Sequence, residues 1–220
     1  MHYYQKIMSP WKRVNSSSKT VDTSQYSDEY GPVLTNILWK ASEKVDGTNV
    51  NFFYDGNHVS YKGHTDKTSF PAWMKEYLDS IATKEFEQLL EQWFGDKEFI
   101  LHCELVGPKI QSNPYSLEEN RIYLFDIYNK TNNSFWPQES LYSVAIDAGF
   151  YVPEQLGTAT LNFWKNKIMS GELASHINPA VEIEGLVIRP VLELKKNNGD
   201  RLIYKIKVKD LLGRAPRKDL

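Results

Sequence analysis

The chain has 220 residues, a length that favours one large domain or one domain with an appendage. Hydrophobic residues make up 41% of it, enough for a sizeable core, and no apolar run approaches membrane-spanning length. The net charge of −2 is unevenly distributed, because residues 189–220 carry +6 and the remainder carries −8. A basic end on an acidic protein suits a polyanionic partner, although a solvated tail would have the same composition.

Cys103 is the single cysteine, so no intramolecular disulfide can form. This cysteine usage indicates a reducing, intracellular setting, and we expect a cytoplasmic protein that does not associate with membranes. Cys103 lies in the apolar run 99–103, where a buried packing role is expected rather than a nucleophilic one.

The first third of the chain predicts loops and a hairpin. Residues 12–36 are rich in Ser, Thr, Asp and Asn, which predicts a loop with short ordered pieces. Residues 37–43 and 49–54 are apolar-rich and predict two strands. Asp55-Gly56-Asn57 predicts a hairpin turn into a further strand at residues 58–62.

The remainder mixes helices and strands without regular βαβ alternation. Apolar residues at helical spacing predict one or two helices between Ala72 and Phe94, closed by Gly95. Further helices are predicted at Pro137–Ala148 and Thr160–Ser170. Strands are predicted at residues 98–106, 121–128, 181–190 and 201–208, with a turn at 197–200. This order favours an α+β fold built on antiparallel sheets with flanking helices.

Five short segments carry residues suited to chemistry. The first is Glu43-Lys44-Val45-Asp46-Gly47-Thr48-Asn49, in which a lysine precedes a tight Asp-Gly turn. Four segments follow in order: Glu104-Leu105-Val106-Gly107, Leu124-Phe125-Asp126-Ile127, Glu184-Gly185-Leu186-Val187-Ile188 and Lys205-Ile206-Lys207. Taken singly, each also fits an ordinary surface turn, core strand or amphipathic strand.

Together these segments resemble the ordered motif set of covalent nucleotidyltransferases, the superfamily of ATP-dependent ligases and mRNA capping enzymes. The resemblance is greatest to phage type-2 RNA ligases, which makes a phage-encoded origin one option. It implies a nucleotidyltransferase (ligase adenylylation) fold, with ATP as the nucleotide. It covers roughly residues 38–209, so we expect residues 1–220 to be a single adenylyltransferase domain.

The resemblance makes Lys44 the nucleophile that forms a covalent lysyl-AMP. A lysine amine attacks phosphorus only when deprotonated, and its ordinary pKa is about 10.4, so the site must lower it. Nearby cations favour the neutral amine, and Lys205 and Lys207 alternate on a strand so that both project to one face. In the family, the lysines of this last motif contact the α-phosphate.

The family also implies a divalent metal, Mg²⁺ or Mn²⁺, organised by Glu184 mostly through bound water. Mg²⁺ prefers oxygen ligands and keeps several waters, so one carboxylate plus phosphates suffices. Glu182 is a nearby competitor, but Glu184 carries the Glu-Gly-x-Val pattern. Asp126 is the second metal-associated candidate, holding a metal-bound water or a lysine.

The remaining implied contacts are to the nucleotide. Glu104 is expected to bond the ribose, and Phe125 to stack on adenine, with Val187 closing the other face. Glu43 matches the nucleotide pocket. The family usually has an arginine shortly after the lysine motif; this chain has none there, and Lys62 is the closest substitute, with His64 a weaker candidate.

Asn49 completes a Gly-Thr-Asn sequence typical of RNA ligases, whereas Asp46-Gly47 is more typical of DNA ligases. The expected substrate is RNA with 5′-phosphate and 3′-hydroxyl ends. The alternatives are a DNA ligase, a capping-type enzyme of the same fold, or an inactive nucleic-acid-binding relative. Related ligases carry a further C-terminal domain that grips nucleic acid. We therefore expect a minimal ligase, a fragment, or a protein partner that supplies the grip, with the basic tail around Arg214, Arg217 and Lys218 contacting phosphates.

Overall fold

The computed structural model describes residues 4–65 and 67–220. The chain divides into two compact units. Unit 1 comprises Asp46–Val152 together with Tyr4, and unit 2 comprises Gln5–Val45 and Pro153–Leu220. The main sheet of each unit is antiparallel throughout, which confirms the predicted α+β class with antiparallel sheets.

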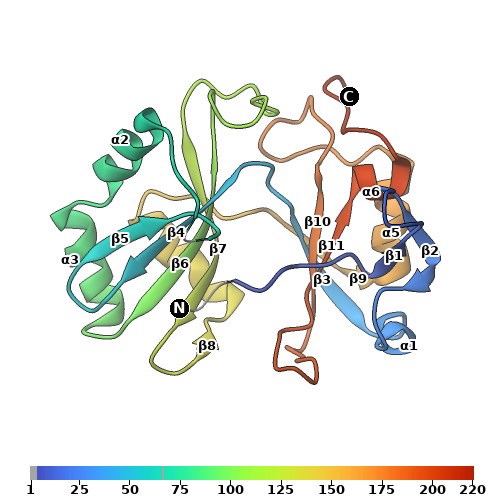
Figure 1. Cartoon of the computed structure of the whole chain (residues 1–220), viewed down its shortest axis with the longest axis horizontal. Helices are drawn as coiled ribbons and strands as arrows, with labels where there is room; N and C mark the ends of the chain where they lie inside the picture. Colours follow the sequence, from blue (N-terminus) through green and yellow to red (C-terminus); the bar gives the residue numbers. More distant parts are fainter. Residues whose placement is uncertain (1–3, 66) are drawn as a thin grey trace. The chain divides into compact units, whose positions relative to one another are not determined.

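Unit 1 is built on a five-stranded sheet in the order β5-β4-β6-β7-β8 (Figure 1). The strands are β4 (Thr48–Tyr54), β5 (Val59–Lys62), β6 (Phe99–Val106), β7 (Arg121–Asn129) and β8 (Ser134–Phe135). The predicted hairpin turn joins β4 to β5, because the Asp55 carboxylate accepts hydrogen bonds from the backbone N–H groups of Asn57 and His58.

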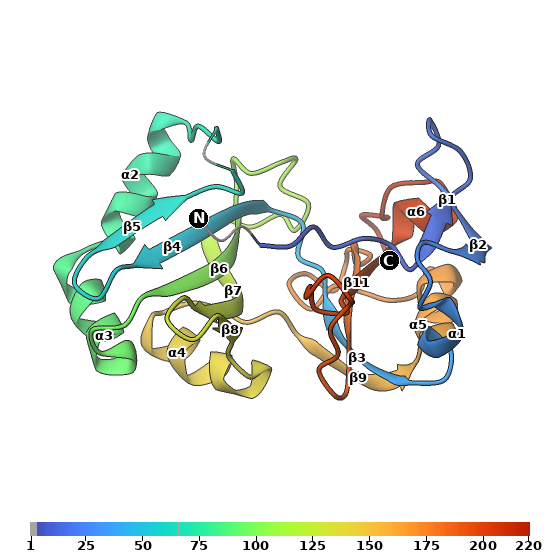
Figure 2. The same ribbon diagram turned by 60° about the horizontal axis from the view of Figure 1, so that its bottom comes forward.

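The helices of unit 1 cover one face of this sheet: α2 (Ala72–Ile81), α3 (Lys84–Phe94) and α4 (Leu141–Asp147). Figure 2 shows α2 and α3 beside β5 and β4, and α4 contacts β7. Their apolar side chains form one core with alternate residues of the strands, among them Leu78, Leu90, Val144, Phe52 and Leu101.

The boundaries of these helices follow local sequence signals. The Thr83 hydroxyl accepts a hydrogen bond from the Phe86 N–H and starts α3, so the region predicted as one or two helices contains two. The helix predicted from Pro137 begins with the 3₁₀ turn η1 (Gln138–Ser140) and continues as α4.

A β-bulge divides the pairing of β6 with β7. His102 lies opposite Asp126 and Cys103 lies opposite Leu124, so Phe125 is the extra residue. Leu124 and Cys103 belong to the core under the helices, whereas Asp126 lies opposite His102 on the other face. A bulge re-aims side chains in this way, and here it takes Phe125 out of the core alternation.

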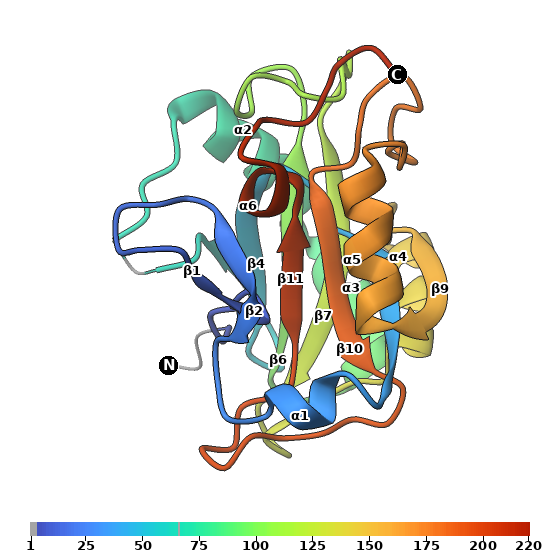
Figure 3. The same ribbon diagram turned by 90° about the vertical axis from the view of Figure 1, so that its right-hand side faces the viewer.

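Unit 2 is built on a four-stranded sheet in the order β11-β10-β3-β9, and Figure 3 shows its strands β11 and β10 side by side. These strands are β3 (Leu38–Glu43), β9 (Gln155–Thr160), β10 (Gly185–Pro190) and β11 (Tyr204–Lys207). A separate hairpin pairs β1 (Trp11–Arg13) with β2 (Val21–Tyr26), so residues 12–36 do contain short ordered pieces.

The helices of unit 2 are α1 (Gly31–Leu34), α5 (Leu161–Ser170) and α6 (Val208–Leu212). Trp164 and Ile168 of α5 pack with Trp39 of β3 and Leu186 of β10 in the core of this unit. In α5 the Thr160 hydroxyl accepts from the Phe163 N–H, close to the predicted start.

Three predictions about strands in unit 2 were wrong or incomplete. The strand predicted from Val181 begins only at Gly185, because the backbone of Glu182 and Ile183 bonds Arg217 and Leu173 instead. The strand predicted over residues 201–208 spans only Tyr204–Lys207, and α6 begins at Val208. Strand β9 was not predicted, since Gln155–Thr160 has little apolar character and contains a glycine.

Within the described residues, no helix has both the length and the apolar character needed to span a bilayer.

Candidate functional site

Lys44 follows directly after β3 in unit 2. Its backbone N–H donates to the Gly185 carbonyl at 2.9 Å, and its Nζ donates to Glu184 Oε2 at 2.7 Å. Nζ of Lys207 forms an ion pair with the other oxygen of the same carboxylate. Glu184 therefore joins the predicted nucleophile to a lysine of the last motif.

Lys205 and Val187 occupy the face of this sheet that turns away from the core. Leu186, Ile188, Tyr204 and Ile206 fill the core face, so the alternating residues Val187, Lys205 and Lys207 lie on the opposite one. Val187 pairs with Lys205 in β11 and with Ser42 in β3. The predicted alternation of the two lysines is confirmed.

The charges of this cluster change its proton affinities. Burial lowers the pKa of Lys205, and the charges of Lys44 and Lys207 lower it further. Burial also lowers the pKa of Lys207, although the charge of Glu184 opposes the shift. For Glu184, burial alone would raise the pKa, but Lys44 and Lys207 outweigh it and lower the pKa. The cluster thus holds an ionised carboxylate among three lysines.

Glu43, the residue before the predicted nucleophile, is buried and bonded to the loop that precedes β10. Its carboxylate accepts from Ser175 Oγ at 2.5 Å and from the His176 N–H at 2.9 Å, and it is 2% exposed. Burial raises the pKa of this carboxyl above its ordinary value. The side chain thereby ties the loop before β10 to the end of β3, and a nucleotide contact by Glu43 stays a prediction.

In unit 1, Glu104 and Asn49 lie opposite each other on β6 and β4. Glu104 Oε1 accepts from the Gly47 N–H at 3.2 Å, and Asn49 Nδ2 donates to the Cys103 carbonyl at 3.2 Å. A Cβ on Gly47 would lie 2.3 Å from the Leu105 carbonyl oxygen, so only glycine permits this close approach. The Asp-Gly turn is thus packed directly against the predicted ribose-binding glutamate.

Phe125 and Asp126 lie on the same face as Glu104, beyond the bulge. Phe125 is half-buried and lies outside the apolar core, which agrees with a stacking role better than with a packing role. Asp126 is fully buried, and its carboxylate accepts from the Tyr4 hydroxyl at 2.6 Å and from Gln138 Nε2 at 3.1 Å. Lys62 lies on β5 opposite Asn51.

The residues at this site fit a divalent metal that is held by one carboxylate, as the sequence suggests, and not by a cluster of protein ligands. Among residues 4–65 and 67–220, no three His, Cys, Asp or Glu side chains are grouped to hold an ion. Glu184 is a single ionised carboxylate whose present partners are both ammonium groups, so a divalent cation could replace their charge there. Asp126 already has two protein donors, and its metal role stays a prediction.

Several contacts at these segments were not singled out from the sequence. The Tyr115 hydroxyl accepts from the Asp46 N–H at 2.6 Å, and Gln111 Nε2 donates to the Gly47 carbonyl at 3.1 Å. Gln111 lies seven residues after Glu104, in the sequence Glu-Leu-Val-Gly-Pro-Lys-Ile-Gln that resembles the family's motif, so the sequence carried a signal for that contact. Nothing local in the sequence indicated Tyr115, Gln138 or Tyr4.

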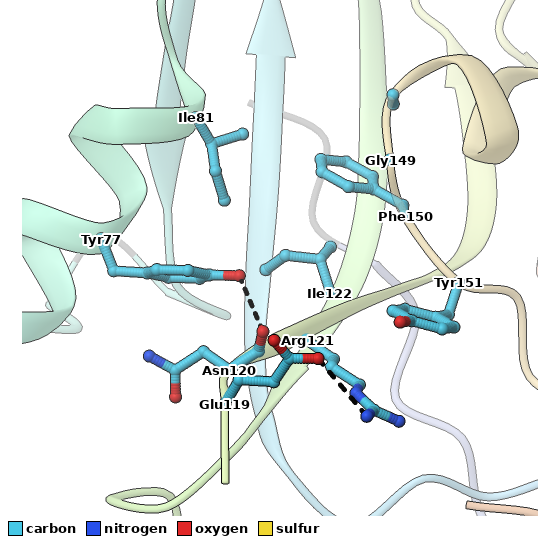
Figure 4. Close-up of a pocket in the computed structure, with 10 residues that line it drawn as sticks. Tyr77, Ile81, Glu119, Asn120, Arg121, Ile122, Gly149, Phe150 and Tyr151 are labelled. Atoms are coloured by element: carbon cyan, nitrogen blue, oxygen red, sulfur yellow. Dashed lines mark hydrogen bonds and ion pairs between the residues drawn. The ribbon is translucent and has the colours of Figure 1, made fainter. Parts of the chain in front are cut away.

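A pocket of about 270 Å³ also lies in unit 1 (Figure 4). Tyr77 and Ile81 of α2, Arg121 and the segment Gly149–Tyr151 surround it. Arg121 lies 5.2 Å from the ring centroid of Tyr151. The predicted site residues are not among those that line this pocket.

The basic tail of the chain is held within unit 2. Arg214 donates to both oxygens of Glu182, at 2.6 and 2.9 Å, and the Arg217 N–H donates to the same carboxylate at 2.8 Å. Glu182 is 1% exposed. Arg214 and Arg217, which we expected to contact RNA phosphates, therefore also serve as partners of a buried acid. Glu182, the competitor of Glu184, is thus already paired with two arginines.

The fold is that of RNA ligases of the nucleotidyltransferase type. A Naegleria gruberi RNA ligase structure with PPi matches at a TM-score of 0.59 and 20% identity, over 80% of this chain and 52% of that chain. A mutant of that ligase with ATP and Mn matches at a TM-score of 0.59 and 17% identity, over 80% of this chain and 50% of that chain. A mutant with AMP and Mn matches at a TM-score of 0.58 and 16% identity, over 94% of this chain and 62% of that chain.

The chain belongs to the RNA ligase family, whose profile matches residues 37–207. This confirms the predicted family. The chain spans between half and two thirds of the length of the solved structures it resembles, and at these identities the structures establish the fold alone. A comparison with curated proteins found no match.

Proposed function

We propose that this chain is an ATP-dependent RNA ligase in which Lys44 becomes covalently adenylylated, and that residues 1–220 act as one adenylyltransferase module. The observation that carries the proposal is the contact of Lys44 with Glu184, which is shared by Lys207, in a chain of the RNA ligase family. A lysine at a strand end, among further lysines of lowered pKa, is suited to attack a phosphate.

The proposed reaction has three displacements at phosphorus. Lys44 Nζ loses its proton and bonds the α-phosphorus of ATP, while the bond to the pyrophosphate oxygen breaks. An oxygen of the RNA 5′-phosphate then bonds that phosphorus, and the lysine leaves as an amine. Finally, an RNA 3′-hydroxyl attacks the 5′-phosphorus, loses its proton and releases AMP.

The protein's part in these steps is positioning and charge neutralisation. Lys205 and Lys207 are proposed to contact the α-phosphate, since both project from one face of β11. Glu104, Asn49 and Lys62 are proposed to contact the nucleotide. A divalent metal at Glu184 would supply further neutralisation of phosphate charge.

The direct test is the intact mass of the protein after incubation with ATP and Mg²⁺. We expect an increase equal to one AMP, located on the peptide that contains Lys44, and no adduct with GTP. A GTP-only adduct would instead indicate a capping-type enzyme. No adduct with any nucleotide, Mn²⁺ included, would favour an inactive relative. Sealing of 5′-phosphorylated RNA, compared with DNA of the same sequence, tests the substrate.

A further inference from the structure

Tyr4 lies on the face of the unit 1 sheet that carries Phe125 and Asp126, and it is far in sequence from both. Its hydroxyl donates to Asp126 Oδ2 at 2.6 Å, across 122 residues. Tyr4 is 9% exposed and is assigned to unit 1, whereas the next residue, Gln5, begins unit 2. A tyrosine buried with its hydroxyl bonded to a fully buried carboxylate is a specific, fixed contact.

The ring of Tyr4 also meets three other rings. Its centroid lies 5.3 Å from that of Phe125 with an interplanar angle of 87°, and 4.8 Å from that of His102 at 66°. Phe135 is 5.8 Å away at 82°. The planes of His102 and Phe125 differ by 21°, so Tyr4 stands edge-on to two nearly parallel rings. Such perpendicular contacts fix the planes of the rings involved.

Phe125 depends on contacts of this kind because of its place in the strand. It is the extra residue of the bulge, without a direct partner on β6, and it lies outside the apolar core. The neighbouring Asp126 is held by Tyr4 on one oxygen and by Gln138 on the other. Tyr4 thus contacts both residues of the Phe-Asp pair at the bulge, one through its ring and one through its hydroxyl.

We propose that Tyr4 is a positioning residue of the nucleotide-base site. Its ring holds the ring of Phe125 in the plane in which it stacks on adenine, and its hydroxyl holds the neighbouring carboxylate of Asp126. The proposal rests on the proposed function, because it takes Phe125 as the stacking residue. Tyr4 acts through Phe125 and not on phosphorus, so its loss affects the binding of ATP more than the rate of attack by Lys44.

The test measures the rate of adenylylation against ATP concentration for the parent chain and three variants. Tyr4→Ala removes the ring and the hydroxyl, and Tyr4→Phe removes only the hydrogen bond to Asp126. Tyr128→Phe is the matched control, because Tyr128 is a buried tyrosine of β7 whose hydroxyl bonds Asn133 instead. Thermal unfolding of each variant without nucleotide identifies any general loss of structure.

We expect Tyr4→Ala to raise the ATP concentration for half-maximal rate about tenfold, part of what loss of a base-stacking ring costs, with a much smaller change in the maximal rate. Tyr4→Phe should raise this ATP concentration less, and Tyr128→Phe should leave it unchanged. Equal losses in the maximal rate and in ATP binding, matched by Tyr128→Phe, would show a structural role only. If Tyr4→Ala bound ATP more tightly, Tyr4 would instead occupy the position of the base.

Failure of the underlying function gives a different result. If the parent chain formed no AMP adduct, the proposed function would fail, and the ATP affinities of the parent and Tyr4→Ala, measured by titration, would still test the role of Tyr4. If the parent formed the adduct and Tyr4→Ala used ATP as the parent does, the function would stand and the role of Tyr4 would be overturned. Should Tyr4→Ala fail to fold, Tyr4→Leu takes its place, because it also removes the ring and the hydroxyl but keeps an apolar side chain. A shift in half-maximal ATP for Tyr4→Leu that Tyr128→Phe lacks supports the role, and its absence overturns it.

Discussion

Nζ of Lys44 donates a hydrogen bond of 2.7 Å to the carboxylate of Glu184, across 140 residues of sequence. Lys207 engages the other oxygen of the same carboxylate. An amine held in this pair as an ammonium has no lone pair to offer to phosphorus. The proposed adenylylation therefore requires Lys44 to lose its proton, and the binding of phosphates and a metal at this cluster would favour that loss.

Replacement of Lys44 by alanine should abolish the AMP adduct and leave the fold intact. The side chain is 23% exposed and its head group packs on Glu184, which retains Lys207 as a partner, so little stability depends on it. Intact mass after incubation with ATP measures the adduct, and circular dichroism measures the fold. Lys40→Ala, on the preceding strand β3, is the control and should keep the adduct. An AMP adduct on another residue of Lys44→Ala would refute the assignment.

Replacement of Phe125 by alanine should weaken ATP binding by about 1–3 kcal/mol, the usual value of a base-stacking ring. A fully buried phenylalanine would instead cost about 3–5 kcal/mol of folding stability. Phe125 is half-buried and outside the core, so we expect nucleotide affinity to fall with only a small change in melting temperature. Titration with ATP and thermal unfolding without it separate the two effects. Phe52→Ala, a change in the core, should show the opposite pattern.

The tail arginines should differ from the tail lysine in their effect on stability. Arg214→Ala removes two hydrogen bonds from the buried carboxylate of Glu182 and should cost about 1.5–3 kcal/mol. Lys218→Ala changes an exposed residue and should leave stability unchanged. Urea unfolding measures both. If Arg214→Ala lowered RNA sealing at unchanged stability, the arginine would contact RNA rather than hold Glu182.

The stabilising effect of Glu182 should depend on pH. Burial alone would raise the pKa of this carboxyl, but the hydrogen bonds from Arg214 and Arg217 outweigh it and lower the pKa below the ordinary value of 4.5. A lowered pKa in the folded state means that the stabilisation is present above pH 4.5 and is lost as the pH falls through the folded-state value.

We therefore expect Glu182→Gln to be less stable than the parent at pH 7, with a difference that shrinks below pH 4.5. Urea unfolding at a series of pH values measures this difference. Glu172→Gln, at an exposed position, is the control and should track the parent throughout. A difference that stayed constant with pH would mean that packing, and not charge, accounts for the effect.

The sequence by itself determined the features that depend on neighbouring residues. The Asp55 turn, the helix that starts after Thr160, and the alternation of Lys205 with Lys207 follow from interactions within a few residues, so local patterns were enough. The ordered motifs likewise indicated the RNA ligase family, which the match over residues 37–207 confirms.

Only the tertiary structure decided what those residues contact. The bulge that takes Phe125 out of the core depends on the register of β6 with β7, and register is set by packing across the sheet rather than by either strand alone. The contacts of Glu184 with Lys44, of Glu182 with Arg214 and of Tyr4 with Asp126 join residues between 32 and 140 positions apart. A local sequence pattern carries no information about such distant partners, because they meet only when the chain has folded.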